Sequence, residues 1–106
     1  PVSTVAGHKG RFVFAHINGV PVVMMQGRVH YYEGYPMTDV VLPVRLMKLM
    51  GAEILFLTNA AGGVNHDYAA GDFMLIRDQI ACFVPSPLIG QNLDELGPRF
   101  ADMPDI

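Results

Sequence analysis

The chain has 106 residues, of which 51% are hydrophobic and 16% are charged, and its formal net charge is -3. A chain this apolar is not an intrinsically disordered tail, and the lack of a basic run excludes the electrostatic footprint of a nucleic-acid-binding protein. The apolar fraction is high for so small a domain. We therefore expect part of the apolar surface to be buried against further chain or against other subunits.

The single cysteine, Cys82, cannot form an internal disulfide, which is typical of a protein of the reducing cytoplasm. We find neither a signal peptide nor an apolar stretch long enough to cross a bilayer, so we expect a cytoplasmic protein without a membrane partner. The sequence begins at Pro1 rather than at a methionine. We therefore expect residues 1–106 to be a single incomplete domain of a longer chain.

Residues 11–26, RFVFAHINGVPVVMMQ, predict a β-hairpin. Two β-rich runs flank Asn18-Gly19, the favoured pair for a two-residue turn because both positions tolerate a positive φ. Pro21 favours an edge position or a late start for the second strand.

Apolar residues at three-to-four spacing predict a helix from about Thr38 to Met50. Thr38 or Asp39 is a candidate for the N-cap, and Gly51 suits the C-terminal end. Pro43 should bend the first turns.

The continuous apolar run 54–58, ILFLT, predicts a central strand that is covered on both faces, and NAAGG at 59–63 follows it as a small-residue loop. Gly71-Asp72 leads into a second predicted strand at 73–76. From Cys82 onward, proline, glycine and asparagine predict a long ordered loop. The alternation of strands with a helix indicates an α/β fold.

The segment RVHYYEG, residues 28–34, concentrates polar chemistry between apolar stretches. If it is extended, Arg28, His30 and Tyr32 share one face, where a guanidinium fork and an imidazole form a good oxyanion clamp. Glu33 can orient His30 or accept a hydrogen bond from a hydroxyl. An edge strand with solvated charges is an equally good interpretation of this segment alone.

The other candidates are weaker when each is considered alone. Residues as small as those of NAAGG let a backbone amide approach an anion, although a plain tight turn explains the loop as well. His8 lies between two glycines and is either a further phosphate donor or a loop histidine. No Cys/His spacing supports zinc, so we expect no metal site.

Considered together and in order, four motifs are informative: STVAGHKG, QGRVHYYEGYP, TNAAGGVN and GDFMLIRD. Their combination resembles the trimeric class of purine nucleoside phosphorylases, over nearly the whole sequence. The resemblance implies a mixed central sheet with flanking helices, of which this chain would be the central portion. It also implies a pentosyltransferase of purine salvage, which uses inorganic phosphate to convert purine (deoxy)ribonucleosides into free base and (deoxy)ribose 1-phosphate.

The resemblance also implies roles for particular residues. It implies a phosphate site made of three side chains and a backbone amide, namely those of His8, Arg28 and His30 and that of Ala60. It implies nucleoside contacts from three further residues, namely Tyr32, Asn59 and Phe100. Glu33 and His30 are the candidate catalytic residues. In this family the phenylalanine matching Phe100 reaches into a neighbouring subunit's sugar site, so a homotrimer is expected.

Phosphate is itself the nucleophile in such a reaction, so no cofactor and no protein nucleophile is expected. Gln79, Ala81 and Gln91 depart from the family pattern and leave the conformation of their loop open. The family's base-reading residues are absent from this sequence, so base preference is undetermined and the isolated segment should be inactive. Two alternatives remain, a noncatalytic phosphate- or nucleotide-binding module and a relative of the methylthioadenosine phosphorylases.

Overall fold

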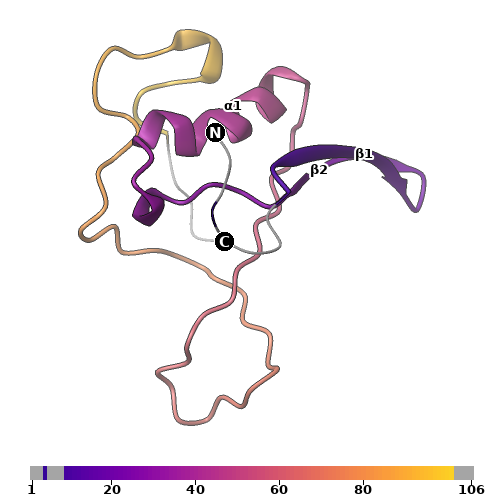
Figure 1. Cartoon of the computed structure of the whole chain (residues 1–106), viewed down its shortest axis with the longest axis vertical. Coiled ribbons are helices and arrows are strands. Elements are labelled where there is room, and N and C mark those ends of the chain that lie inside the picture. Colours follow the sequence, from indigo (N-terminus) through magenta and orange to yellow (C-terminus); the bar gives the residue numbers. More distant parts are fainter. Residues whose placement is uncertain (1–3, 5–8, 102–106) are drawn as a thin grey trace.

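The computed structural model describes Thr4 and residues 9–101 (Figure 1). This part of the chain contains a two-stranded antiparallel sheet, one α-helix and two short 3₁₀ helices. In chain order the elements are β1 (Arg11–Ile17), β2 (Val20–Gln26), η1 (Tyr31–Glu33), α1 (Met37–Leu49) and η2 (Asp94–Leu96).

The predicted hairpin is confirmed. Strands β1 and β2 pair from Arg11 opposite Gln26 to Ile17 opposite Val20. The turn residues Asn18 and Gly19 have φ values of 50° and 82°, as a two-residue turn matched to the twist of the strands requires. Pro21 lies in β2 opposite His16, and the two-stranded sheet of the described residues leaves it on an edge strand, as predicted.

The predicted helix is also confirmed, with bounds one residue earlier at each end. The proposed N-cap was wrong, because α1 begins after Pro36, which makes no side-chain capping bond. Thr38 and Asp39 therefore lie inside the first turn, where the Asp39 carboxylate still interacts favourably with the helix dipole. Pro43 lies within α1 and has no amide hydrogen to donate to the carbonyl one turn earlier.

Gly51 ends the helix as predicted. Its φ is +98°, in the left-handed region that glycine adopts at little cost. The Gly51 amide donates to the Lys48 carbonyl at 3.0 Å, and the Ala52 amide donates to the Met47 carbonyl at 3.1 Å. This pair of bonds is a Schellman motif, which satisfies carbonyl groups that the last helical turn leaves open.

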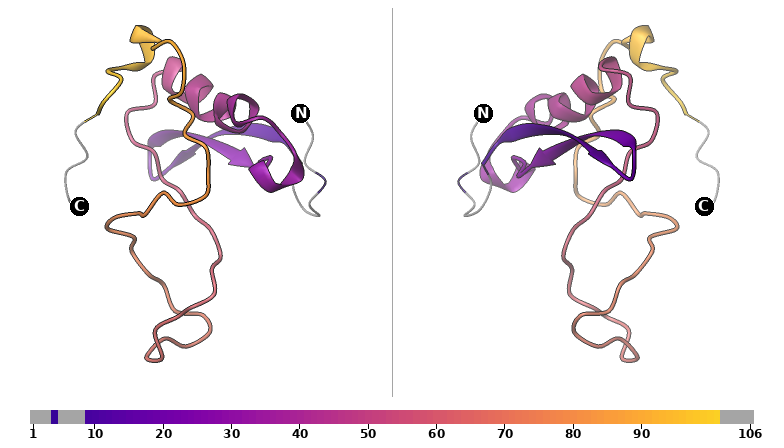
Figure 2. Two further views of the ribbon diagram at one scale, coloured as in Figure 1. Left: turned by 90° about the vertical axis from the view of Figure 1, so that its left-hand side faces the viewer. Right: turned by 90° about the vertical axis from the view of Figure 1, so that its right-hand side faces the viewer.

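The most buried apolar side chains of the described residues come from the segment between β2 and α1 and from α1 itself. Val29 is 8% exposed and Met47 is 9% exposed. Figure 2 shows α1 above the hairpin, and Figure 1 shows that the hairpin projects to one side of the helix. A hollow of about 180 Å³ lies between them, lined mainly by apolar side chains: Phe12, Met25, Val29, Leu42, Pro43 and Leu46, together with Gly10, Gly27, Arg28 and Asp39.

The strands predicted at 54–58 and 73–76 are not formed, so that prediction was wrong for this chain. Both segments are irregular, and their large apolar side chains face solvent, with Phe56 85% exposed and Phe73 fully exposed. A central strand requires hydrogen-bonded neighbours on both sides, and the described residues provide none for either segment. In Figure 1 the chain between these two segments forms the long loop that extends away from the hairpin and helix.

The predicted long loop after Cys82 is confirmed, interrupted only by the short helix η2 within the described residues. The Asn92 side chain stabilises this part by donating to Asp94 at 2.6 Å and to the Gly97 carbonyl at 3.1 Å. Across Thr4 and residues 9–101, no helix has the length and apolar character needed to traverse a bilayer.

Candidate functional site

The segment that joins β2 to α1 carries most of the predicted site. This segment is residues 27–36, and two of its glycines have φ in the left-handed region, Gly27 at 79° and Gly34 at 90°. The extended conformation on which the shared face of Arg28, His30 and Tyr32 depended is not kept, because Tyr31–Glu33 form the 3₁₀ helix η1. The Glu33 amide donates to the His30 carbonyl at 3.1 Å and closes this turn.

His30 lies at the start of η1 in an extended conformation, and the turn brings Glu33 back against it. The Glu33 Oε1 atom lies 2.7 Å from His30 Nδ1 and accepts the His30 backbone N–H at 2.8 Å. An ionised carboxylate only accepts hydrogen bonds, so Nδ1 is the donor in this pair and the orientation of the ring is fixed. The predicted contact between Glu33 and His30 is therefore present.

Tyr32 approaches His30 through the turn rather than along an extended strand. The two rings are stacked, with centroids 4.7 Å apart and planes 18° from parallel. Tyr32 is nevertheless 75% exposed, so one side of this aromatic pair faces solvent. The predicted proximity of His30 and Tyr32 is confirmed, although by a different local geometry.

The second oxygen of Glu33 binds Thr4. Oε2 accepts hydrogen bonds from the Thr4 backbone N–H at 2.7 Å and from Thr4 Oγ1 at 2.9 Å. Burial alone would raise the pKa of Glu33, but the hydrogen bonds from His30 and Thr4 outweigh it and lower this pKa to about 2. Glu33 is therefore an anion at neutral pH.

Arg28 connects the segment to the small-residue loop. Its Nη2 atom donates to the carbonyl of Thr58 at 3.2 Å, and Thr58 directly precedes the NAAGG residues. Within that loop the Asn59 side chain donates to the Ala60 carbonyl at 3.2 Å. Two motifs about 30 residues apart in sequence thus meet at the guanidinium.

The two remaining predicted site residues are Phe100 and His8. Phe100 is 86% exposed, and the Arg99 guanidinium carbon lies 5.9 Å from the centroid of its ring. His8 lies outside the described residues. Over Thr4 and residues 9–101, no group of three or more His, Cys, Asp or Glu side chains could hold a metal ion.

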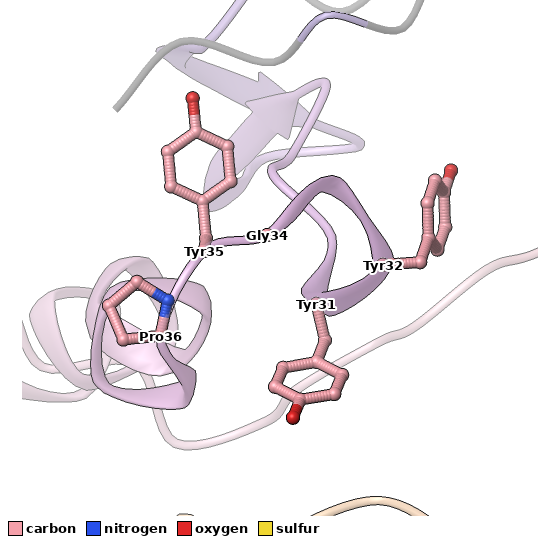
Figure 3. A pocket seen from close by; sticks show the side chains of 5 residues that line it. All are labelled: Tyr31, Tyr32, Gly34, Tyr35 and Pro36. Carbon is pink, nitrogen blue, oxygen red and sulfur yellow. The ribbon is translucent and has the colours of Figure 1, made fainter.

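An open hollow of about 420 Å³ surrounds η1. Its lining is Tyr31, Tyr32, Gly34, Tyr35 and Pro36 (Figure 3). Figure 3 shows that Tyr31 and Tyr32 point away from each other, so the hollow is a broad surface depression rather than an enclosed pocket. Of the described residues that line it, Tyr32 alone was predicted to belong to the site.

Two contacts of the site were not anticipated from the sequence. The Thr58 carbonyl has no sequence signal beyond its place before NAAGG. Thr4 belongs to the STVAGHKG motif, and the motif itself is the only signal that could have identified it. Chemically, the arrangement offers a guanidinium, an imidazole held by a carboxylate, and an adjacent loop of small residues. These are groups that recognise an oxyanion.

The hairpin, the helix and the loops that connect them are compatible with part of an α/β fold. Comparison with known proteins gives the family. The sequence model described as "Phosphorylase superfamily" matches residues 1–106, and the chain therefore belongs to the phosphorylase superfamily.

Curated relatives carry more specific names. The chain is 54% identical over 103 residues to purine nucleoside phosphorylase 1 of Bacillus subtilis (strain 168), covering 97% of this chain and 38% of that protein. It is 52% identical over 108 residues to purine nucleoside phosphorylase of Bos taurus, covering 99% of this chain and 37% of that protein. It is 46% identical over 109 residues to purine nucleoside phosphorylase of Saccharomyces cerevisiae (strain ATCC 204508 / S288c), covering 97% of this chain and 34% of that protein. The chain thus spans little more than a third of the length of these relatives.

Proposed function

We propose that the complete protein containing this chain catalyses the phosphorolysis of purine (deoxy)ribonucleosides. The products are a free purine base and (deoxy)ribose 1-phosphate, which makes the enzyme a pentosyltransferase of purine salvage. The names of relatives about 50% identical to this chain support this function over the two alternatives. The structural observation that carries it is the Arg28 contact with Thr58, which brings the basic segment to the NAAGG loop.

In this proposal inorganic phosphate binds beside Arg28 and His30. The guanidinium offers a fork of two N–H donors to two oxygens, and the imidazole adds a further polar contact. The Ala60 amide contributes a main-chain donor, and His8 completes the set. Glu33 contributes to catalysis by holding the His30 ring, through the 2.7 Å contact between Oε1 and Nδ1.

The reaction requires a nucleophile below the anomeric carbon and an anion near the charge that develops there. A phosphate oxygen forms a bond to the anomeric carbon as the N-glycosidic bond breaks, and the bonding electrons leave with the purine, which is then protonated. The transition state has oxocarbenium character, so the phosphate anion stabilises it. Holding both reactants together removes much of the orientational cost, worth up to about 7–11 kcal/mol in favourable systems. Since phosphate is the nucleophile, this scheme requires neither a metal nor a cofactor.

Nucleoside contacts are proposed for Tyr32 and Asn59 from the same chain and for Phe100 from a neighbouring subunit. The exposure of the Phe100 and Tyr32 rings is compatible with contacts to a second molecule. We further propose that the complete enzyme is a cytoplasmic homotrimer. In it, residues 54–58 and 73–76 would be strands of a mixed central sheet with flanking helices, which would bury their exposed apolar side chains.

The test is an assay of base release by the complete protein. Inosine, guanosine and adenosine are each incubated with and without inorganic phosphate, and hypoxanthine, guanine and adenine are measured separately. The proposal predicts release that depends on phosphate and is matched by formation of ribose 1-phosphate. Binding of phosphate without base release would instead identify a noncatalytic module, and cleavage of methylthioadenosine in preference to the other nucleosides would identify the related branch.

A further inference from the structure

Glu33 is the meeting point of two motifs that lie 29 residues apart in the chain. Among the described residues, Oε1 accepts two hydrogen bonds from His30 and Oε2 accepts two from Thr4, at distances between 2.7 and 2.9 Å. A carboxylate has about four lone-pair sites, and these donors engage both of its oxygens. Both ends of the carboxylate are therefore restrained.

The contact with Thr4 affects how firmly the Glu33 carboxylate is held. The Glu33 side chain is only 3% exposed, whereas Thr4 is exposed, so Thr4 covers the carboxylate from the solvent side. The terminal torsion of a glutamate side chain is soft, so a carboxylate whose Oε2 keeps only the Thr4 backbone N–H is held less firmly against rotation. Rotation moves Oε1, which holds His30 Nδ1, so a loss at Thr4 is transmitted to the imidazole.

We propose that Thr4 is a positioning residue for His30 and acts through Glu33. The proposal rests on the proposed function, in which the His30 ring contacts phosphate. Thr4 itself touches neither substrate. Its hydroxyl fixes the rotation of the carboxylate, and the carboxylate fixes the imidazole in the orientation that suits an anion beside Arg28. The STVAGHKG motif thereby influences the phosphate site through Thr4 as well as through any contact made by His8.

A purely structural role for Thr4 makes different predictions. If Thr4 only anchored this end of the chain, its loss would lower the melting temperature and impair both substrates alike. A positioning role confines the defect to phosphate. The backbone N–H of Thr4 donates to Oε2 whatever side chain is present, so a side-chain substitution tests the hydroxyl alone.

The test compares Thr4→Val with Thr4→Ser in the complete protein. Valine is close to threonine in shape but lacks the hydroxyl, whereas serine retains it. We expect Thr4→Val to raise KM for phosphate about five- to tenfold, as for the net loss of one ordinary hydrogen bond. KM for the nucleoside should change less than about twofold, and Thr4→Ser should behave like the unmodified protein.

A double-mutant cycle sharpens the test. In a His30→Ala background the ring that Thr4 positions is gone, so adding Thr4→Val should raise KM for phosphate no further. Additive effects of the two substitutions would overturn the proposal. It would likewise be overturned if Thr4→Val left KM for phosphate unchanged, or if it raised KM for both substrates equally.

Failure of the proposed function is distinguishable from failure of this inference. If the unmodified protein releases no base, the function is wrong, and Thr4 is then judged from crystal structures of the unmodified protein, Thr4→Val and Thr4→Ser. The inference predicts that the contact between His30 Nδ1 and Glu33 Oε1, 2.7 Å here, is longer in the valine variant and unchanged in the serine variant. The same contact in all three structures would contradict it.

Discussion

Residues 9–52 and residues 53–101 differ sharply in how much structure they form. The first region contains the hairpin, η1 and α1, all held by hydrogen bonds between residues close in sequence. The second contains only η2 as a helix, and Phe56 and Phe73 face solvent. Elements with short-range hydrogen bonds therefore form within this chain, whereas buried strands need neighbouring strands from elsewhere.

Two arginines of the first region connect it to the second. Arg28 donates to the Thr58 carbonyl at 3.2 Å, and Arg45 donates to the Pro87 carbonyl at 3.3 Å. Both contacts run from a side chain to a backbone carbonyl, so the second region is positioned here without any sheet pairing. The candidate phosphate site lies at the first of these two connections.

The largest expected effect comes from truncating Phe56 in the complete protein. If residues 54–58 become a buried strand there, Phe56→Ala should lower the free energy of unfolding by about 3–5 kcal/mol, as for other buried phenylalanines. Urea denaturation measures it. A change within about 0.5 kcal/mol, typical of a surface position, would mean that this segment stays as exposed as it is here.

Arg28→Ala tests the connection at the proposed site. Loss of a charged phosphate contact should remove about 2–4 kcal/mol of transition-state stabilisation and strongly raise the phosphate requirement. Steady-state kinetics with phosphate as the varied substrate measures this effect. Arg11→Ala is the matched control, because Arg11 bonds Gln26 across the hairpin at 2.7 Å and should leave the phosphate dependence intact. An unchanged phosphate dependence in Arg28→Ala would remove Arg28 from the site.

Phe100→Ala should impair nucleoside binding across a subunit boundary. We expect KM for the nucleoside to rise roughly tenfold, because an aromatic contact at an interface contributes about 1–2 kcal/mol. KM for phosphate should hardly change, and Phe14→Ala, which removes an exposed ring from the hairpin, serves as the control. If the Phe100 variant is still a trimer and binds nucleoside normally, Phe100 has no such role.

The smallest expected effect is an acid dependence of stability due to Glu33. Its pKa falls from 4.5 to about 2 in the folded chain, so its stabilising contribution is complete above pH 4.5 and is lost as pH falls toward 2. Unfolding free energies of the complete protein across this range should therefore decline more steeply than those of Glu33→Gln. Equal slopes for the two proteins would show that the hydrogen bonds to Glu33 do not stabilise its ionised form.

The sequence predicted the elements whose signals are local. Asn18-Gly19 marked the hairpin turn, and Gly51 marked the end of α1. The strands at 54–58 and 73–76 were predicted from apolar runs, which report a preference for burial but do not supply hydrogen-bonding partners. The turn at η1 was missed because the alternation of Arg28, His30 and Tyr32 suggested an extended chain, whereas the Glu33 carboxylate bonds back to His30.

The candidate site was predicted as a set of residues, but its internal contacts were only partly predicted. The pairing of Glu33 with His30 was one of two roles considered for Glu33, and the structure contains it. The contacts of Arg28 with the Thr58 carbonyl and of Glu33 with Thr4 each span about 30 residues. Side chains at such separations meet only through the fold, so residue spacing alone cannot reveal them.

In the proposed enzyme, Arg28, His30 and the NAAGG loop hold one phosphate between them. A crystal structure of the complete protein with inorganic phosphate and a nucleoside analogue tests it most directly. The account predicts a phosphate within hydrogen-bonding distance of the Arg28 guanidinium, the His30 imidazole and the Ala60 amide, facing the anomeric carbon. A phosphate bound elsewhere, with Arg28 and His30 directed toward separate surfaces, would contradict it.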